Sequence, residues 1–436
     1  MRDGDTIVAL SSGSLPSGVA VIRISGPATR LVIMALAGDL PAPRKLSLRP
    51  IQIDAEVLDH GLVAFFPSPH SFTGEDCAEL QVHGAPAIVR ALLRGICAHE
   101  GVRLAEAGEF TRRAFEHGKL DLTEVEGLGD LIIAETEGQR VQALARMTGG
   151  LSEKLEIWRL QMLDLRAEIE ARLDFSDEGD VSDDLPAEWF ESLGDLEGAL
   201  EQALGDVQRG RIIREGFRVA LAGRPNAGKS SLLNALAKSD LAIVSDEAGT
   251  TRDVREVPLD LDGQLVIFVD MAGLRESDSM AETEGVRRAE AEIKRADLVL
   301  WLQAPDDDGM PYDSPTDSPI WRVATKADLG LDNGTDPDHV VSVIDERGLS
   351  DLIAAIREAA GENTGAGDTV LVSRERDRLA LNEALLRIRA VRAELAAPEI
   401  AAEALRQASD ALARLIGKLD PEQVLDRLFI HFCIGK

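Results

Sequence analysis

The sequence predicts a multidomain α/β protein: an N-terminal α+β domain, then a discontinuous helical bundle domain, and an α/β domain with a mostly parallel sheet inserted into the bundle. Three observations support this fold class. Strand and helix patterns are mixed before residue 119, single helical stripes flank a central segment, and strands alternate with helices after residue 217. The length of 436 residues suits about three domains.

The N-terminal domain is expected at residues 1–118. A strand-like run at 19–24, a strand-like stretch ending at 78–82 and a helix-like run at 87–97 indicate a compact α+β domain. No apolar run approaches the roughly 18 residues of a membrane span, and the first residues lack a signal-peptide pattern. We therefore expect a cytoplasmic protein with no membrane contact.

The helical domain is expected in two parts, at 119–210 and 367–436. Each part carries an apolar stripe with spacings of mostly four and three residues. The stripes are Leu151, Leu155, Trp158, Met162, Leu165, Ile169 and Leu173, and then Leu405, Ala408, Leu412, Leu415 and Leu419. Neither part forms a complete bundle alone, so each should pack against the other. Residues 174–197 hold ten acids and no Lys or Arg, and we expect a solvated acidic loop there rather than a functional acidic surface.

Composition restricts the possible partners. The chain has 47 Lys and Arg against 77 Asp and Glu, a formal net charge of −30, and only 4% aromatic residues. Broad adhesion to nucleic acid or anionic lipid needs clustered basic residues, so it is not expected here. An RNA partner needs a second subunit or a local basic patch. One candidate patch, which is equally compatible with a solvated helix edge, is Arg209, Arg211, Arg214 and Arg218. The three cysteines, Cys77, Cys97 and Cys433, lack the spacing of a zinc site or a disulfide framework.

The strongest motif is a phosphate-binding loop at residues 223–230, which reads Gly-Arg-Pro-Asn-Ala-Gly-Lys-Ser. It follows a predicted strand and opens a predicted helix, which is the context that a P-loop requires. Backbone N–H groups can surround phosphate oxygens, Lys229 can reach the β and γ phosphates, and Ser230 can hold Mg²⁺. The central segment, 211–366, is therefore predicted to be a P-loop GTPase domain once its companion motifs are added.

The companion motifs follow in the expected order. Thr251, in the Gly-Thr-Thr-Arg-Asp stretch, is the natural second Mg²⁺ ligand, and Asp270 begins an Asp-x-x-Gly motif after a strand. Asp328 can accept hydrogen bonds from both N1–H and N2–H of guanine, so the expected nucleotide is GTP or GDP. The residues expected to bind it are Asn226, Ala227, Gly228, Lys229, Ser230, Ser231, Ser245, Asp246, Glu247, Ala248, Gly249, Thr250, Thr251, Asp270, Met271, Ala272, Gly273, Thr325, Lys326 and Asp328.

Two positions depart from the usual guanine-binding pattern. Thr325 replaces the usual Asn, whose amide ties this loop to the P-loop, so we expect weaker nucleotide binding with the guanine preference kept by Asp328. Ser342-Val343-Ile344 stands where Ser-Ala-Lys is usual, and the backbone N–H of Val343 is expected to serve guanine O6.

The water-orienting Gln of signalling GTPases is absent, because Leu274 follows Gly273. Another group must then neutralise charge and position water. Asn226, Ser245, Thr250 and carbonyls around Glu247 can coordinate a monovalent cation in the place of an arginine finger. Glu282 is the candidate for orienting water; the alternative is an ordinary exposed acid.

The motifs together resemble the MnmE (TrmE) family of tRNA modification GTPases, which have a TrmE-Era-like G domain. The resemblance covers essentially the whole chain, and it includes the segments 5–7, 21–27, 71–76, 108–115 and 118–123 and the terminal Phe-Cys-Ile-Gly-Lys. It implies a folate-binding N-terminal domain similar to the glycine-cleavage T-protein, a homodimer formed through that domain, and a heterotetramer with the FAD-dependent MnmG. It also implies K⁺-dependent GTP hydrolysis and addition of a carboxymethylaminomethyl-type group to C5 of the tRNA wobble uridine.

Residue roles carried over by motif are also implied by this resemblance. Arg23, Glu79, Lys119 and Lys436 would contact 5-formyltetrahydrofolate; Glu79 suits the N–H donors of the pterin, and the three cations suit the glutamate tail. K⁺ would be held by Asn226, Ser245, Glu247 and Thr250, Mg²⁺ by Ser230 and Thr251, and hydrolysis would be assisted by Glu282. Cys433 is either a nucleophile or a structural thiol, and we favour the structural role.

Two other functions stay open at this point. A ribosome-assembly GTPase of the Era type would share the G-domain motifs but should lack a folate domain and carry an RNA-binding module. A folate-dependent one-carbon transferase with a regulatory G domain should release tetrahydrofolate on its own.

Overall fold

A computed structural model describes residues 4–174, 184–243, 256–270, 291–305, 318–330, 336–364, 369–419 and 435. The chain divides into two compact units: Met1–Gly129 with Ala413–Lys436, and Asp130–Leu412. The boundaries expected at residues 118, 210 and 366 stay predictions. No helix in the described ranges is long and apolar enough to span a bilayer.

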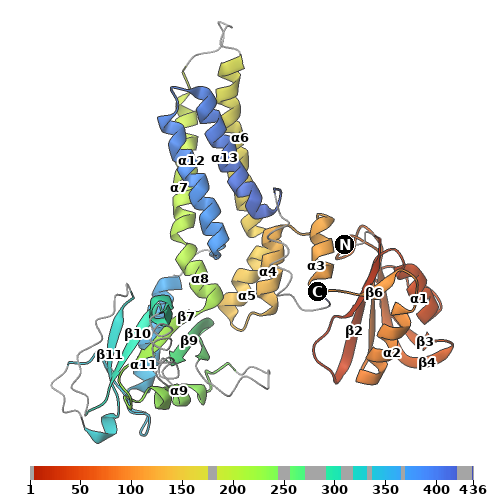
Figure 1. The fold of residues 1–436 in the computed structure, drawn as a ribbon, viewed down its shortest axis with the longest axis horizontal. Coiled ribbons are helices and arrows are strands. Elements are labelled where there is room, and N and C mark those ends of the chain that lie inside the picture. The colour runs from red at the N-terminus through yellow and green to blue at the C-terminus, as the bar shows by residue number, and fades with distance from the viewer. Residues whose placement is uncertain are drawn as a thin grey trace, which may run out of the picture. The chain divides into compact units, whose positions relative to one another are not determined.

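The first unit is built on a mixed sheet. Its strands are β1 (Thr6–Leu10), β2 (Ser17–Ser25), β3 (Ser47–Ile53), β4 (Glu56–Phe66), β5 (Cys77–Gly84) and β6 (Val102–Leu104), and their order is β3-β4-β5-β2-β1-β6. Neighbours are antiparallel except the parallel pair β1 and β6. The helices are α1 (Thr29–Ala37), α2 (Pro86–Cys97), α3 (Glu109–Glu116) and α4 (Leu122–Ile132), which crosses the unit boundary. The expected strands and helix therefore correspond to β2, β5 and α2, of which β2 and α2 are labelled in Figure 1.

Alternating residues of the strands form the core of this unit. Val8, Ile22, Ile24 and Leu80 are fully buried, and Leu92 of α2 packs onto them. Their period of two places the intervening residues, among them Arg23, on the opposite face of the sheet. The fold thus leaves one face of β2 and β5 for polar side chains.

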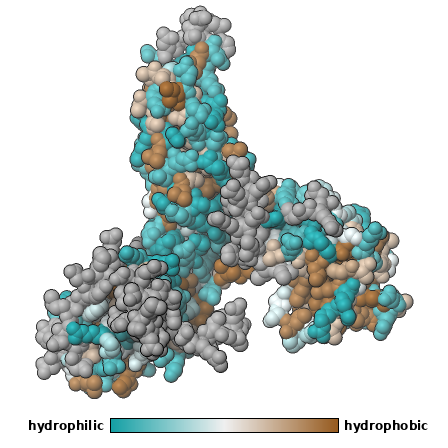
Figure 2. Space-filling model, in the orientation of Figure 1, coloured by the Kyte–Doolittle hydropathy of each residue, from teal (hydrophilic) through white to brown (hydrophobic). Residues whose placement is uncertain are grey.

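The helical part of the second unit contains α5 (Glu137–Met147), α6 (Gly150–Asp174), α7 (Ala187–Gly205), α8 (Val207–Glu215), α12 (Glu375–Ala393) and α13 (Pro398–Ile416), whose last turn belongs to the first unit. Helices α7 and α12, from opposite sides of the inserted domain, pack together as expected (Figure 1). The predicted stripe of α6 is buried at Leu151, Leu155, Met162, Leu165 and Ile169. Hydrophilic residues predominate on the outer surface of these helices in the view of Figure 2.

The acidic segment is not a loop throughout, so that expectation is wrong for residues 187–197. Helix α7 begins at Ala187 and buries Trp189, Leu193, Leu196 and Leu200, which are four, three and four residues apart. The indole N–H of Trp189 donates a hydrogen bond to the carbonyl of Leu165 at 2.9 Å. The acids of this segment occupy the exposed face of an amphipathic helix, so a high acid content does not by itself indicate a loop.

The inserted domain has a mostly parallel sheet, as predicted. Its strands are β7 (Phe217–Ala222), β8 (Glu256–Leu261), β9 (Gln264–Asp270), β10 (Leu298–Gln303), β11 (Ile320–Ala324) and β12 (His339–Val340), in the order β12-β11-β10-β7-β9-β8. Only the edge strand β8 is antiparallel to its neighbour among these described strands. The other described elements are α9 (Lys229–Ala237), α11 (Leu349–Thr364) and the 3-10 turn η2 (Ala327–Leu329). The carboxyl ends of the parallel strands meet at one edge, where ligands bind in such sheets.

The chain enters the inserted domain near Gly210 and leaves it near Val370, and helix α5 contacts both of these segments. The Gln142 side-chain amide donates hydrogen bonds to the carbonyls of Gly210, at 3.2 Å, and Val370, at 2.9 Å. One turn later, Arg146 and Asp377 form a fully buried ion pair of 2.9 Å. The backbone N–H of Gly138 also donates to the carbonyl of Gly263, in the β8–β9 turn, at 2.8 Å.

Candidate functional site

The loop between β7 and α9 has the backbone of a phosphate cradle. Gly223 has φ +140°, and a Cβ there would lie 2.4 Å from the carbonyl oxygen of Leu302 in β10. Gly228 has φ +94° and precedes the first turn of α9, while Asn226 adopts φ +63°. These conformations turn successive backbone N–H groups toward one side, at a helix N-terminus, and that arrangement favours an anion.

Lys229 crosses this loop with a buried side chain. Its ammonium donates hydrogen bonds to the carbonyls of Gly223 and Arg224, each at 2.8 Å. The charge therefore lies over the mouth of the loop, where the β and γ phosphates of a nucleotide are expected.

The two motifs predicted to serve Mg²⁺ meet in space. The Ser230 hydroxyl donates a hydrogen bond to the Asp270 carboxylate at 2.9 Å, and Asp270, at the end of β9, is only 6% exposed. Both groups offer oxygen, which Mg²⁺ prefers, and Mg²⁺ commonly completes its shell with phosphate and water. The donor set fits the ion, with Thr251, the other expected ligand, outside the described residues.

Thr325 ties the guanine-reading loop to the P-loop, which corrects the expectation that this tie is lost. Its hydroxyl lies 2.7 Å from the carbonyl oxygen of Ala227 and 3.1 Å from that of Gln303. Thr325 is 4% exposed, so these contacts are shielded from water. A hydroxyl makes the contact that an amide usually makes, and the basis for expecting weaker nucleotide binding is removed.

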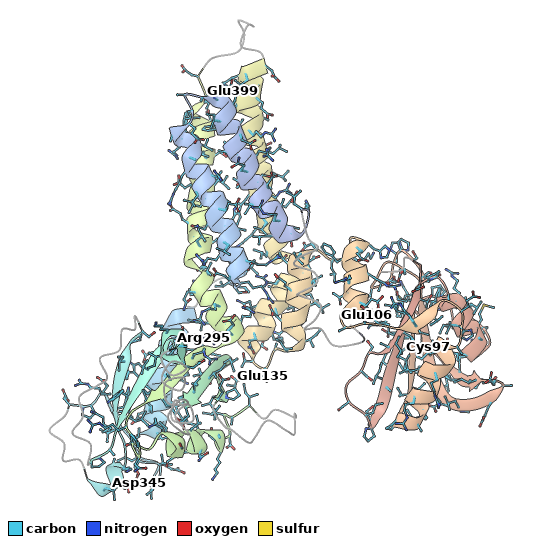
Figure 3. All side chains as sticks on the ribbon, viewed as in Figure 1. Cys97, Glu106, Glu135, Arg295, Asp345 and Glu399 are labelled. Atoms are coloured by element: carbon cyan, nitrogen blue, oxygen red, sulfur yellow. The ribbon has the colours of Figure 1, made fainter. Side chains whose placement is uncertain are left out.

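Asp328 is positioned by the loop that follows β12. The Ser342 hydroxyl, fully buried, donates to the Asp328 carboxylate at 2.9 Å, while Asp328 itself is exposed and accessible to a base. Within the described residues, the backbone N–H of Val343 has no hydrogen-bond partner, which suits its expected role toward guanine O6. Asp345, labelled in Figure 3, belongs to the same loop.

Several predicted site residues lie outside the described residues, so their roles stay predictions. They are Ser245, Asp246, Glu247, Ala248, Gly249, Thr250, Thr251, Met271, Ala272, Gly273, Glu282 and Lys436, together with Cys433. Of the remaining nucleotide residues, Ser231 and Lys326 flank the groups described above, and Lys326 adopts φ +54°.

A second cluster lies on the polar face of the N-terminal sheet. Arg23 of β2 stands opposite Glu79 of β5, and the guanidinium donates to the Glu79 carboxylate at 2.9 Å and 3.1 Å. The structure thus brings together two of the residues expected to contact folate, and their assignment to the pterin and to the glutamate tail stays a prediction.

Lys119 and Gly435, which precedes the expected folate residue Lys436, also lie in this domain. Lys119 is exposed beside the loop at 71–76; a Cβ on Gly74 of that loop would lie 3.5 Å from its Cγ. Gly435 packs onto the end of β1: the Ser11 hydroxyl donates to its carbonyl at 2.7 Å. With φ +102°, a Cβ on Gly435 would lie 2.2 Å from the carbonyl oxygen of Leu10, so only glycine fits.

Phe72, which is not among the predicted site residues, lies beside the Arg23–Glu79 pair. Its ring centroid lies 5.4 Å from the guanidinium carbon of Arg23, and the side chain is 37% exposed. The available signal was an aromatic residue inside a polar, glycine-containing loop, in a chain with few aromatics.

The candidate RNA-binding arginines are all engaged with acids. Arg209 contacts Asp206, Arg211 contacts Asp297, and Arg214 contacts Glu215; Arg218 reaches Glu256 and Glu292. Neutralisation by neighbouring carboxylates weakens attraction to phosphate. The structure therefore favours the helix-edge interpretation of this cluster.

The described cysteines offer no reactive thiol. Cys77 is buried beside Ser25 and Thr73. Cys97, labelled in Figure 3, ends α2, and burial raises the pKa of its thiol. A raised pKa lowers the thiolate fraction at neutral pH and with it the reactivity.

Two family models and several curated proteins match this chain. The family model of the MnmE helical domain matches residues 122–433, and that of the GTP-binding protein TrmE N-terminus matches residues 6–119. The tRNA modification GTPase MnmE of Azorhizobium caulinodans is 50% identical over 439 residues, covering 100% of both chains. The proteins of the same name from Rhizobium meliloti and Rhodopseudomonas palustris are 48% and 44% identical, over 100% and 99% of both chains.

Solved structures with detectable similarity match part of the chain. The G domain of the T. maritima iron transporter FeoB is 26% identical, covers 33% of this chain and 98% of its own, and has a TM-score of 0.25. Aquifex aeolicus Era is 24% identical, with 40% and 66% coverage and a TM-score of 0.27.

Proposed function

The chain belongs to the MnmE family of tRNA modification GTPases, and from that premise we propose a K⁺-dependent GTPase that acts in the cytoplasm with the FAD-dependent MnmG. Together they add a carboxymethylaminomethyl-type group to C5 of the tRNA wobble uridine, with a folate as the one-carbon source. As a member of this family, the chain is a GTP hydrolase of tRNA modification that binds GTP and GDP.

The observation that carries the proposal is the convergence of separate motifs on one nucleotide site. Lys229 spans the phosphate loop, Ser230 contacts Asp270, and the Thr325 hydroxyl links the base-reading loop to Ala227. These residues lie at the carboxyl ends of three strands, β7, β9 and β11, that are far apart in sequence. Their arrangement can bind phosphate, Mg²⁺ and guanine at the same time.

Within this site, each residue has a task toward phosphoryl transfer. Lys229 offsets negative charge on the β and γ phosphates, and Ser230 and Asp270 would hold Mg²⁺, which supplies further positive charge when bound. Asp328, oriented by Ser342, selects guanine because adenine lacks the N–H pair that a carboxylate can accept.

K⁺ would replace the missing arginine finger. Asn226 is exposed on the phosphate loop, and its side-chain amide has no hydrogen-bond partner among the described residues. A free amide oxygen next to the phosphates suits a monovalent cation, and Leu274 provides no hydrogen-bonding atom for water. Ser245, Glu247 and Thr250 would complete the site, and Glu282 would orient the attacking water.

The test is GTP turnover in KCl and in NaCl at equal ionic strength, with saturating Mg²⁺. We expect strong stimulation by K⁺ that is lost in Asn226→Ala. Asn234→Ala, which removes another exposed asparagine from the following helix, is the matched control and should keep the stimulation. Equal rates in the two salts would exclude a K⁺-dependent mechanism.

The tRNA reaction is tested separately by mass spectrometry of wobble nucleosides. Cells without this protein should lack the modification, and fully modified uridines would contradict the proposal. The one-carbon transferase alternative predicts release of tetrahydrofolate without MnmG. The ribosome-assembly alternative expects a chain without the N-terminal domain, and the match of residues 6–119 speaks against it.

The proposed assembly, a homodimer that binds MnmG as a heterotetramer, is tested by analytical ultracentrifugation of the purified chain with and without MnmG. We expect a dimer that shifts to a larger species when MnmG is added. A monomer at micromolar concentration, or no shift, would contradict this part of the proposal.

A further inference from the structure

The guanidinium of Arg218, near the start of β7, contacts two carboxylates at once. The same nitrogen, Nη2 of Arg218, lies 2.7 Å from a carboxylate oxygen of Glu256 and 3.0 Å from one of Glu292. Glu256 is the first residue of β8, and Glu292 lies in the helical turn formed by residues 291–295. One cation thus joins three segments of the inserted domain that are far apart in sequence.

The position of Arg218 is also fixed by its backbone. Its N–H donates a hydrogen bond to the Asp297 carboxylate at 3.0 Å, and the N–H of Asp297 donates to the carbonyl of Arg218 at 2.8 Å. Arg211 of α8 contacts the same carboxylate. Burial tends to lower the pKa of Arg218, but the hydrogen bonds and charges of Glu256 and Glu292 outweigh it and raise the pKa. Arg218 is therefore a well-anchored, permanently charged group.

Glu256 lies next to the predicted Mg²⁺ site. In the register of β8 and β9, Glu256 stands opposite Val269, the residue before Asp270. Along the chain, the other expected Mg²⁺ ligand, Thr251, comes five positions before Glu256. The contact with Arg218 therefore holds the end of the segment that carries Thr251.

Glu292 lies at the end of a second segment with an expected role in the reaction. Glu282, the candidate for orienting water, comes ten positions before Glu292. The turn that contains Glu292 packs on the sheet through Ile293, which is 7% exposed and belongs to the same apolar cluster as Ala222, the last residue of β7. Arg218 and Ile293 together hold this turn against the strand that leads into the phosphate loop.

We propose that Arg218 is a positioning residue for GTP hydrolysis: it holds the ends of the segments that carry Thr251 and Glu282, and so sets where these residues meet the nucleotide. A guanidinium suits this task because its planar fork of N–H donors can bind two carboxylates in one geometry. Arg218 stands at the opposite end of β7 from the phosphate loop, so it acts through other residues. The inference rests on the GTPase part of the proposed function, and it requires neither K⁺ nor folate.

This arrangement predicts a particular kinetic pattern. The groups that bind GDP, Lys229 and Asp328 among them, lie on other loops at the carboxyl edge of the sheet. Loss of Arg218 should therefore leave nucleotide affinity unchanged and lower kcat, since small misplacements of reacting groups slow the chemical step strongly. Because Glu256 and Glu292 act through the same cation, the effect of losing either acid should not add to the effect of losing Arg218.

The experiment is steady-state GTP turnover by the full-length chain in KCl with saturating Mg²⁺, together with the affinity for a fluorescent GDP analogue. The variants are Arg218→Gln, Arg218→Lys, Glu256→Gln, Glu292→Gln and the double variant Arg218→Gln/Glu256→Gln. The matched control is Arg295→Gln, labelled at Arg295 in Figure 3. Arg295 also contacts Glu292, at 3.5 Å, but its side chain is 72% exposed. Circular dichroism and thermal unfolding of each variant report on folding.

We expect Arg218→Gln to lower kcat about tenfold and to leave the GDP affinity unchanged. Glu256→Gln and Glu292→Gln should each lower kcat severalfold, and the double variant should be no slower than Arg218→Gln. Arg218→Lys, which keeps the charge, should recover part of the rate. Arg295→Gln should behave like the wild type.

Other results overturn the inference in different ways. A wild-type kcat in Arg218→Gln would remove the positioning role and leave the GTPase function intact. Equal losses of kcat and GDP affinity, with a lowered unfolding temperature, would show that Arg218 only stabilises the domain. A double variant slower than Arg218→Gln would show that the acid and the cation act separately.

Two further outcomes are decided by the same set of proteins. If Arg218→Gln does not fold, wild-type rates in Arg218→Lys, Glu256→Gln and Glu292→Gln would overturn the inference. A wild type without GTP turnover would overturn the GTPase function itself, and the positioning role with it.

Discussion

The hydroxyl of Thr325 lies 2.7 Å from the carbonyl oxygen of Ala227, so the loop that reads guanine and the loop that holds phosphate are joined by one buried hydrogen bond. The same hydroxyl lies 3.1 Å from the Gln303 carbonyl at the end of β10. Through this hydroxyl, both nucleotide-binding loops are held against the end of β10.

Thr325→Val keeps the size of this side chain and removes its hydroxyl. We expect the affinity for GDP to fall about tenfold, because a buried hydrogen bond contributes about 1 kcal/mol and the carbonyls left behind lose a partner. Thr325→Ser is the control and should bind like the wild type. Dissociation rates of a fluorescent GDP analogue provide the measurement; equal rates for Val and Ser would show that the tie has no effect.

Ser342→Ala should reduce discrimination between GTP and ITP. The Ser342 hydroxyl orients the Asp328 carboxylate at 2.9 Å, and ITP lacks the 2-amino group that this carboxylate accepts. Without the anchor, the second hydrogen bond to guanine is less well aligned, and we expect its advantage to shrink severalfold. Competition binding measures the ratio of the two affinities. An unchanged ratio would mean that other contacts orient Asp328.

Arg146→Met should destabilise the second unit by about 3–5 kcal/mol, because it leaves a buried carboxylate without its cation. Burial alone would raise the pKa of Asp377, yet the charge and hydrogen bond of Arg146 prevail and lower it. Adding Asp377→Asn to Arg146→Met removes the stranded charge and should restore most of the stability. Calorimetric unfolding of the single and double variants decides the point, and a double variant no more stable than the single one would refute it.

Glu109→Gln should destabilise the first unit at pH 7, and the destabilisation should shrink as the pH falls below the ordinary range of a glutamate. Burial tends to raise the pKa of Glu109, but hydrogen bonds from Arg103, the Glu106 backbone and Arg113 together lower it. A folded-state pKa below the unfolded value of about 4.3 stabilises the fold above that pH, and the stabilisation is lost as pH falls through the folded pKa. The control is Glu106→Gln, at an exposed position labelled in Figure 3. Thermal unfolding across this range should show the difference in stability between Glu109→Gln and the wild type shrink on acidification. A constant difference would contradict the linkage.

Gly138→Ala should loosen the contact between α5 and the β8–β9 turn. A Cβ at Gly138 would lie 2.7 Å from the carbonyl oxygen of Gly263, so the two backbones must separate, at a cost of about 1–3 kcal/mol. Gly198→Ala is the opposite control: nothing lies within 4 Å of a Cβ there, and Ala should stabilise α7 by about 0.5–1 kcal/mol. Calorimetry of both variants tests the pair, and destabilisation of both would point to helix effects unrelated to the contact.

Much of the fold was predictable because its signals are local. The stripes of α6, the strand that becomes β2 and the P-loop each depend on residues within a few turns of one another. Helix α7 was missed for a local reason too, since acids on its exposed face suggested a loop around Trp189.

The contacts that define the sites were less predictable because they depend on pairing between distant segments. Arg23 meets Glu79 only because β2 and β5 pair in one register, and a shift by one residue would turn Arg23 to the other face. The hydrogen bond from Thr325 to Ala227 likewise requires that the carboxyl end of β11 lies next to the P-loop. Neither relationship has a signal in the sequence around the residues involved.

The amide of Gln142 also fixes where the inserted domain starts and stops. Because one side-chain nitrogen contacts the carbonyls of Gly210 and Val370, the two crossing points are neighbours in space. Domains whose ends lie close together can be excised or exchanged with little disturbance to the host. A short linker between the two insertion points could therefore replace the inserted domain while α8 and α12 keep their positions. An unrelated domain whose termini lie close together could be inserted there in the same way.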